Sequence, residues 1–183
     1  MMLTPADIAD LNNQQFSNDF LLKLRQIYSA ENYCSRRLPL VVEKLPASPL
    51  LTLLDDHLPQ IKTRKAYVDG IFKILSIKSG GTVCSIFKSL IGKAGSIIYH
   101  IKPKELTSSF ELIDILLEIS IYRGHIYNHL QQSAKSLENP FITNVLSICI
   151  AEEDNFFYEL LNIKKSMTST DGSKAKFSSF ETA

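Results

Sequence analysis

The chain has 183 residues, and its 20 basic and 19 acidic side chains leave a formal net charge of +1. This balance creates no overall field that would attract nucleic acid or an anionic membrane surface, so neither is expected as a partner. Hydrophobic residues make up 45% of the chain, too many for a disordered protein, and the length suits one domain with a single core.

The amino-terminal region and the cysteines favour a cytoplasmic protein. Residues 1–15 are acidic and polar, without the basic and apolar segments of a signal peptide. No run reaches the roughly 20 apolar residues that a membrane span needs. Cys34, Cys84 and Cys149 are widely spaced and form no CxxC pair, so neither a zinc motif nor a redox motif is indicated.

The first half of the chain predicts two long helices. Residues 1–16 are predicted to form a flexible lead-in, after which apolar residues recur in steps of three and four to about residue 41. A second such stripe runs from Ser48, a capping residue, to about residue 75. Pro39 and Pro59 lie inside the two stripes, so each is expected to kink its helix without ending it.

The second half predicts one short helix and two long ones. Lys78 to Gly81 read KSGG, a turn, and a weak helix interrupted by Gly92 and Gly95 follows over about 82–100. We expect it to form part of a long crossover over the end of the bundle. Long helices are predicted over about 107–137 and from Pro140 to about 166, and the polar segment 167–183 is predicted to be a disordered tail.

Two helical hairpins joined by a long crossover predict an all-α, ferritin-like antiparallel four-helix bundle over residues 17–166. A simple up-down-up-down bundle would share the periodicity, but the long middle connection favours the ferritin-like topology. The crossover helix carries an apolar surplus that either covers the bundle or forms a dimer surface: Ile86, Phe87, Leu90, Ile91, Ile97 and Ile98.

Three polar residues interrupt the apolar stripes near the middle of their helices. Glu31 lies between Ile27 and Cys34, and His57 and Glu153 occupy the same kind of inward position in other helices. Ferritin-like di-metal sites are built from inward carboxylates and histidines on facing helices. Because a buried carboxylate without a partner costs several kcal/mol, a metal ion or a positive side chain is expected nearby.

The rest of a di-metal ligand set is missing. Such a site needs about four carboxylates and two histidines, with Glu-x-x-His spacing on two helices. Glu153 is followed three residues later by Phe156, and the stripe of the third long helix carries Arg123 where an acid is expected. The second helix offers Arg64. Arginine keeps its proton and cannot bind a metal ion, but it can form bidentate contacts with a carboxylate.

Other histidines give a weaker signal. His125 and His129 have the i, i+4 spacing of a helical chelate, but the nearest acid, Glu118, lies seven residues before His125. This pair is interpreted as an ordinary polar helix face. A residual site for a single metal ion, held by Glu31, His57 and Glu153, remains an alternative at this point.

Over residues 19–163 the chain resembles the YciE/YciF group, bacterial ferritin-like proteins linked to stress responses. Residues 24–31 read LRQIYSAE, close to the group's L-x-x-L-Y-x-A-E opening. The later markers keep their order and spacing: LP at 38–39, SP at 48–49, HL at 57–58, IFKIL at 71–75, Cys84, LI at 90–91, and AEE at 151–153.

The resemblance implies the bundle fold and makes Glu31, His57 and Glu153 retained ligand positions of a degraded site. The group's third helix usually reads E-H-Y-E, whereas residues 120–123 read SIYR here, and Gln60 replaces a further acid. Our hypothesis is that Arg123, together with Arg64, holds Glu31 or Glu153 in an internal ion pair.

The sequence thus favours a non-catalytic bundle without a cofactor, acting as a stress-related or accessory protein through contacts with an unidentified protein partner and with a second copy of itself. The alternative is a metal-binding oxidoreductase or storage protein of ferritin type, using iron or manganese. A third interpretation, an unrelated helical adaptor or immunity-type protein, would pack its hairpins in a different order.

Overall fold

The structure is a computed structural model that describes residues 17–100 and 106–177. Within these ranges every regular element is helical: α2 (Asn18–Val42), α3 (Pro49–Ile74), α4 (Ser85–His100), α5 (Leu106–Ala134), the 3-10 turn η1 (Lys135–Leu137) and α6 (Pro140–Phe177). None of these helices offers a segment long and apolar enough to cross a membrane.

Side-chain caps and prolines fix where the helices begin. The Ser17 hydroxyl accepts a hydrogen bond from the Phe20 amide at 3.1 Å, which satisfies one of the free donors at the start of α2. Ser48 caps α3 in the same way, and a proline follows it at the first helical position. Pro39 and Pro59 lie within α2 and α3, as predicted.

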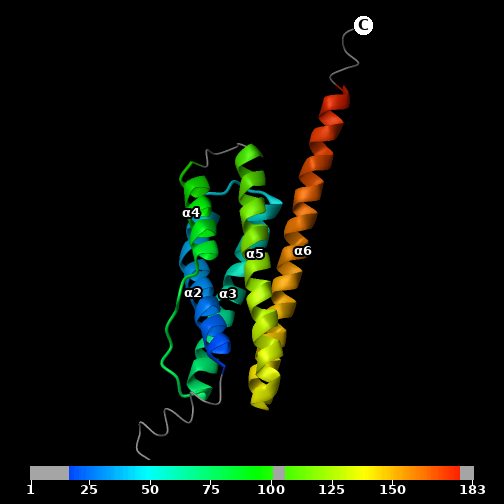
Figure 1. The fold of residues 1–183 in the computed structure, drawn as a ribbon. Coiled ribbons are helices and arrows are strands. Elements are labelled where there is room, and N and C mark those ends of the chain that lie inside the picture. Colours follow the sequence, from blue (N-terminus) through cyan, green and yellow to red (C-terminus); the bar gives the residue numbers. More distant parts are fainter. Residues whose placement is uncertain (1–16, 101–105, 178–183) are drawn as a thin grey trace, which may run out of the picture.

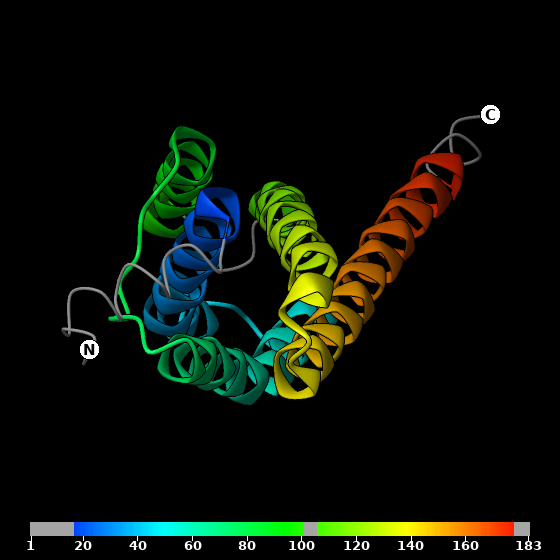
Figure 2. The same ribbon diagram turned by 60° about the horizontal axis from the view of Figure 1, so that its bottom comes forward.

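The four long helices form a ring in which every neighbour is antiparallel. The α2–α3 and α5–α6 hairpins pack against each other through α2 with α5 and through α3 with α6 (Figures 1 and 2). This arrangement confirms the antiparallel four-helix bundle with a long crossover containing a short extra helix. Facing stripes of the four helices meet in one continuous core.

The crossover runs along the side of the bundle, which differs from the expected path over its end. The Thr82 amide donates to the Arg25 carbonyl oxygen of α2 at 3.1 Å. The Phe87 ring of α4 lies 6.0 Å from the Tyr33 ring of α2 and 5.0 Å from the Tyr122 ring of α5. Burial of apolar α4 side chains between α2 and α5 explains this position, since it removes them from water along a whole helix face.

The apolar surplus of α4 therefore serves mainly to cover the bundle. Phe87, Leu90 and Ala94 are buried, whereas Ile86 is 64% exposed on the outer side. Figure 2 shows α4 outside the ring formed by the four long helices.

Gly81 is required by the close approach of the crossover to α2. A Cβ atom at Gly81 would lie 2.0 Å from the Ser29 Oγ atom and 3.3 Å from the Ser29 Cα atom. We expect Gly81→Ala to lower the free energy of unfolding by about 1–3 kcal/mol, because the loop must move off the helix. Urea unfolding measures the difference.

The neighbouring Gly80 provides the matched control. A Cβ atom at Gly80 would meet the Arg25 side chain at 3.8 Å, an ordinary contact distance. Gly80→Ala should therefore leave stability unchanged or raise it slightly. Equal stability of the two alanine variants would show that the loop does not pack as described.

The last helix is longer than the sequence predicts. α6 continues to Phe177, so residues 167–177 of the predicted disordered tail are helical, and Figure 1 shows this part extending past the other helices. No proline follows Pro140 in the chain, and each residue added to an existing helix gains a hydrogen bond without a new nucleation cost. The predicted lead-in over 1–16 and the tail residues 178–183 lie outside the described residues.

Candidate functional site

A cluster of polar side chains occupies the centre of the bundle, midway along the helices. Each of the four long helices contributes to it, and its members are at most 2% exposed: Glu31 from α2, His57 and Arg64 from α3, Arg123 and Tyr127 from α5, and Glu153 from α6. We call these six residues the central cluster. Such burial of charge is tolerated only where the charges are paired and hydrogen-bonded.

Arg123 connects the two buried carboxylates. Its Nε and Nη2 atoms donate to Glu31 Oε1 at 3.1 Å and 2.8 Å, and Nη2 also lies 2.9 Å from Glu153 Oε2. Burial alone would lower the pKa of Arg123, but the carboxylates of Glu153 and Glu31 raise it well above its usual range. Arg123 is therefore a permanent cation between two anions.

Tyr127 adds a third donor to the same oxygen. Its hydroxyl donates to Glu31 Oε1 at 2.7 Å, and burial raises the pKa of the Tyr127 hydroxyl well above its usual range. Tyr127 thus remains a neutral donor. Sequence reasoning missed this residue, although it follows Arg123 by four positions and so lies on the same helix face.

Arg64 links the remaining members of the central cluster. Its Nη2 atom lies 2.9 Å from His57 Nε2 and 3.7 Å from Glu153 Oε2, and its Nε atom lies 3.6 Å from Glu31 Oε1. Its Nη1 atom donates to Oε2 of the partly exposed Glu152 at 3.4 Å. Through these contacts Arg64 supplies the second buried positive charge.

The contacts of His57 fix its protonation state. An arginine can only donate, so the His57 Nε2 atom, 2.9 Å from Arg64, must accept with its lone pair. The proton then lies on Nδ1 and is donated to Gln60 Oε1 at 3.0 Å. Burial, followed by the positive charges of Arg64 and Arg123, lowers the pKa of His57 to about 2. The ring also stacks on Phe156 at 3.7 Å.

Glu153 is less well satisfied than Glu31. Its contact with Arg123 is short but not aligned as a hydrogen bond, and neither of its carboxylate oxygens has a hydrogen-bond partner among the described atoms. Burial raises the pKa of the Glu153 carboxyl, and the Arg123 and Arg64 guanidinium groups act in the opposite direction. Ser120, another buried polar residue of α5 that sequence reasoning missed, also lowers this pKa.

The three predicted ligand residues are brought together, and each of them already contacts an arginine. Glu31 and Glu153 share Arg123, and the His57 lone pair that would bind a metal ion accepts from Arg64. Within residues 17–100 and 106–177, no three His, Cys, Asp or Glu side chains converge in a geometry that could hold a metal ion. As arranged here, the donor set does not fit a pair of metal ions.

His125 and His129 do not join the central cluster. His129 Nε2 lies 3.1 Å from Asp19 Oδ2 near the surface, where both side chains are about half exposed. This is a surface contact of a polar helix face.

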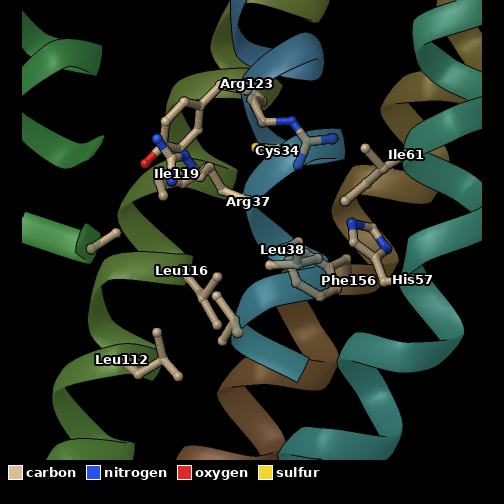
Figure 3. Close-up of a pocket in the computed structure, with 13 residues that line it drawn as sticks. Cys34, Arg37, Leu38, His57, Ile61, Leu112, Leu116, Ile119, Arg123 and Phe156 are labelled. Carbon is tan, nitrogen blue, oxygen red and sulfur yellow. The ribbon is translucent and has the colours of Figure 1, made fainter. Parts of the chain in front are cut away.

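A cavity of about 40 Å³ lies beside the central cluster. Figure 3 shows its labelled side chains from α2, α3, α5 and α6, with His57 and Arg123 among them and apolar residues making up most of the wall. A single water molecule needs about 10–15 Å³, so the cavity has room for several non-hydrogen atoms.

Two cysteines near the site are expected to resist modification. Burial raises the pKa of the Cys34 thiol to about 11 and that of the Cys149 thiol to about 12, whereas Cys84 is only partly buried. Since the thiolate is the reactive form, we expect native protein at pH 8 to show one fast-reacting thiol, with the other two at least about 100-fold slower. Ellman's reagent, applied before and after unfolding, measures this.

Cys84→Ser should abolish the fast phase, and Cys34→Ser should leave it unchanged. Two or more fast thiols in the native protein would contradict the burial described.

The fold and the central cluster define the class of this protein: an antiparallel four-helix bundle with a crossover helix and a buried, ion-paired centre. A family model described as "Domain of unknown function (DUF892)" matches residues 15–171, and the chain belongs to this family. A search of curated protein sequences gave no match.

The solved structures that resemble the chain include YciF and YcfI. The Escherichia coli stress protein YciF matches with a TM-score of 0.75 at 20% identity, covering 83% of this chain and 96% of YciF. YcfI from Rhodopseudomonas palustris matches with a TM-score of 0.69 at 26% identity, covering 77% of this chain and 89% of YcfI. The resemblance to the YciF group is thereby confirmed.

Proposed function

We propose that this protein is a non-catalytic, cytoplasmic, ferritin-like bundle in which arginine side chains have replaced the metal ions of an ancestral site. One observation carries the proposal: Arg123 Nη2 lies 2.8 Å from Glu31 Oε1 and 2.9 Å from Glu153 Oε2, between the two carboxylates at the retained ligand positions. A guanidinium group neutralises carboxylates as a metal ion does, but it has no redox chemistry and no open coordination position.

Elemental analysis of purified protein tests this part of the proposal. Protein from cells grown with added iron and manganese should contain less than about 0.1 equivalent of any transition metal, because a metal ion would have to displace the buried guanidinium groups that contact His57, Glu31 and Glu153. The optical spectrum should not change on addition of ferrous iron and oxygen. Stoichiometric iron, manganese or zinc that survives gel filtration would overturn the proposal in favour of a metal-binding oxidoreductase or storage protein.

The function then depends on contacts with other proteins. Ile86 and Ile121 are 64% and 52% exposed, and both line a surface groove of about 550 Å³ beside α4. Exposed apolar residues grouped around a groove are typical of a protein-protein contact surface. We propose that a second copy of the chain binds here, and that the dimer serves in a stress response, as the printed name of YciF indicates for that protein.

Light scattering coupled to gel filtration tests the dimer. The wild-type chain should elute with twice the mass of the monomer, and Ile86→Lys and Ile121→Lys should shift it to the monomer mass. Phe141→Lys is the matched control, because Phe141 is 50% exposed but does not line this groove. A monomeric wild type, or a dimer that both groove variants retain, would rule out this surface without affecting the metal analysis.

A further inference from the structure

The cavity beside the central cluster has the character of a binding site for a hydrocarbon chain. Its wall includes Leu38 of α2, Ile61 of α3, Leu116 of α5 and Phe156 of α6 (Figure 3), together with Ala94 of α4. All five helices therefore contribute apolar surface to it. An apolar cavity of this kind excludes water and favours an apolar guest of matching size.

The inner end of the cavity offers no charge that a ligand could neutralise. His57 is neutral, with its Nε2 lone pair and its Nδ1 proton both in hydrogen bonds. Arg123 also reaches the wall, but it already lies against the carboxylates of Glu31 and Glu153. A charged group of a ligand would therefore gain nothing at this end.

The outer end leads to the surface between α2 and α4. Tyr33 and Arg37 line both the cavity and a second surface groove. This groove also has a volume of about 550 Å³, but it is not the groove proposed for the dimer. Gly92 and Gly95 form the α4 side of this groove, and a Cβ atom at either would meet nothing within 4 Å. Glycine within a helix costs roughly 0.5–1 kcal/mol relative to alanine. No close contact requires these two glycines.

Arg37 supplies a positive charge at the outer end of the cavity. Its side chain is exposed, and it stands where the apolar cavity meets the surface groove. A guanidinium group at the mouth of an apolar cavity matches a ligand with a carboxylate at one end and a hydrocarbon chain at the other.

We propose that this cavity binds a short aliphatic carboxylate, with the hydrocarbon chain inside and the carboxylate on Arg37. The volume of about 40 Å³ is about three to four times the minimum space for one water molecule, so a chain of about four carbons fills it. The cavity shares His57 and Arg123 with the central cluster, but the ligand contacts that the proposal needs are those of Arg37 and the apolar wall, so it depends neither on the proposed loss of metal nor on the dimer surface.

Titration calorimetry with the sodium salts of straight-chain carboxylates, from ethanoate to octanoate, tests the proposal. Affinity should rise about fourfold with each added methylene group and level off once about four to five chain carbons are present. The straight-chain alcohol of equal length should bind at least about fivefold more weakly, because it lacks the charged contact with Arg37. Affinity that is independent of chain length in the wild-type protein would overturn the proposal.

Two variants test the apolar cavity and the Arg37 contact at its mouth independently. Ala94→Leu places three more carbon atoms at the cavity wall and should abolish the dependence on chain length. Arg37→Gln should remove the preference for carboxylate over alcohol, whereas Arg36→Gln, at an exposed neighbour that does not line the cavity, should retain it. Unchanged binding by Ala94→Leu, or equal behaviour of Arg37→Gln and Arg36→Gln, would overturn the site. If Ala94→Leu does not fold, the wild-type chain-length series decides.

Discussion

Replacement of Arg123 by leucine is expected to lower the free energy of unfolding by about 3–5 kcal/mol. The leucine variant removes the closest cation from the carboxylates of Glu31 and Glu153, which are at most 1% exposed, and leaves them only the longer contacts with Arg64 at 3.6 and 3.7 Å. The cost is therefore mainly the penalty of two buried carboxylates that have lost their closest cation, with a smaller contribution from lost packing. Urea or thermal unfolding of the purified variant measures it.

A double-mutant cycle shows that the loss comes from the ion pair. Glu31→Gln in the Arg123→Leu background should recover part of the stability, because it removes one unpaired charge and keeps the side-chain shape. Arg36→Leu, at an exposed position of α2, is the control and should change stability by less than about 0.5 kcal/mol. A loss below about 1 kcal/mol for Arg123→Leu would mean that the carboxylates are not buried as described.

The second large effect is acid destabilisation through His57. Burial and the two arginines lower the pKa of His57 to about 2 in the folded protein, against 6.5 for the unperturbed side chain. Between these values the unfolded state binds the proton and the folded state does not, so the free energy of unfolding falls as the pH falls. Each pH unit below 6.5 should lower the free energy of unfolding by about 1.4 kcal/mol, so the total loss at pH 5 is about 2 kcal/mol.

Comparison with His57→Gln isolates this effect. Glutamine at this position cannot take up a proton. Between pH 7 and pH 5 the free energy of unfolding should therefore fall by about 2 kcal/mol less in the variant than in the wild type. His129→Gln leaves the central cluster intact and should retain the wild-type slope. Parallel stability curves for the wild type and His57→Gln over this range would contradict the neutral, hydrogen-bonded imidazole.

Glu153 acts in the opposite sense on the same curve. Burial raises its pKa above 4.5, so the folded state takes up this proton before the unfolded state does. The ionised Glu153 carboxylate lowers the free energy of unfolding. This loss is recovered as the pH falls through the pKa of Glu153 in the folded state towards 4.5. This opposing contribution is present in both the wild type and His57→Gln, so the difference between them still reports on His57.

The local features of the fold could be predicted from sequence, and the long-range path of the crossover could not. Ser48 and the apolar stripes act within a few residues, so they indicate helix starts and inward faces directly. The position of the crossover depends on Phe87 reaching two other helices, which spacing along one chain does not reveal. The continued helix beyond residue 166 depends on elongation from a packed segment, which a polar composition hides.

In the candidate site, too, the inward positions could be predicted from sequence and the individual contacts between helices could not. The inward stripes contain Glu31, His57, Arg64, Arg123 and Glu153, and all five are buried in the structure. The pairing of Arg123 and Arg64 with the buried acids is a hypothesis that the sequence supplies, but periodicity does not reveal which atoms meet. Tyr127 donates to Glu31, and Arg64 donates to the His57 lone pair. Both contacts depend on the directions of side chains across helix interfaces.

We propose that an arginine, and not a metal ion, lies between Glu31 and Glu153. Nitrogen-15 NMR of the arginine side chains during a manganese titration tests it most directly, with the Arg123 Nε–H signal assigned by its loss in Arg123→Lys. We expect this signal to be slow in solvent exchange, because Nε donates to buried Glu31 at 3.1 Å, and to keep its intensity with one equivalent of manganese. Its selective disappearance at stoichiometric manganese would contradict the account.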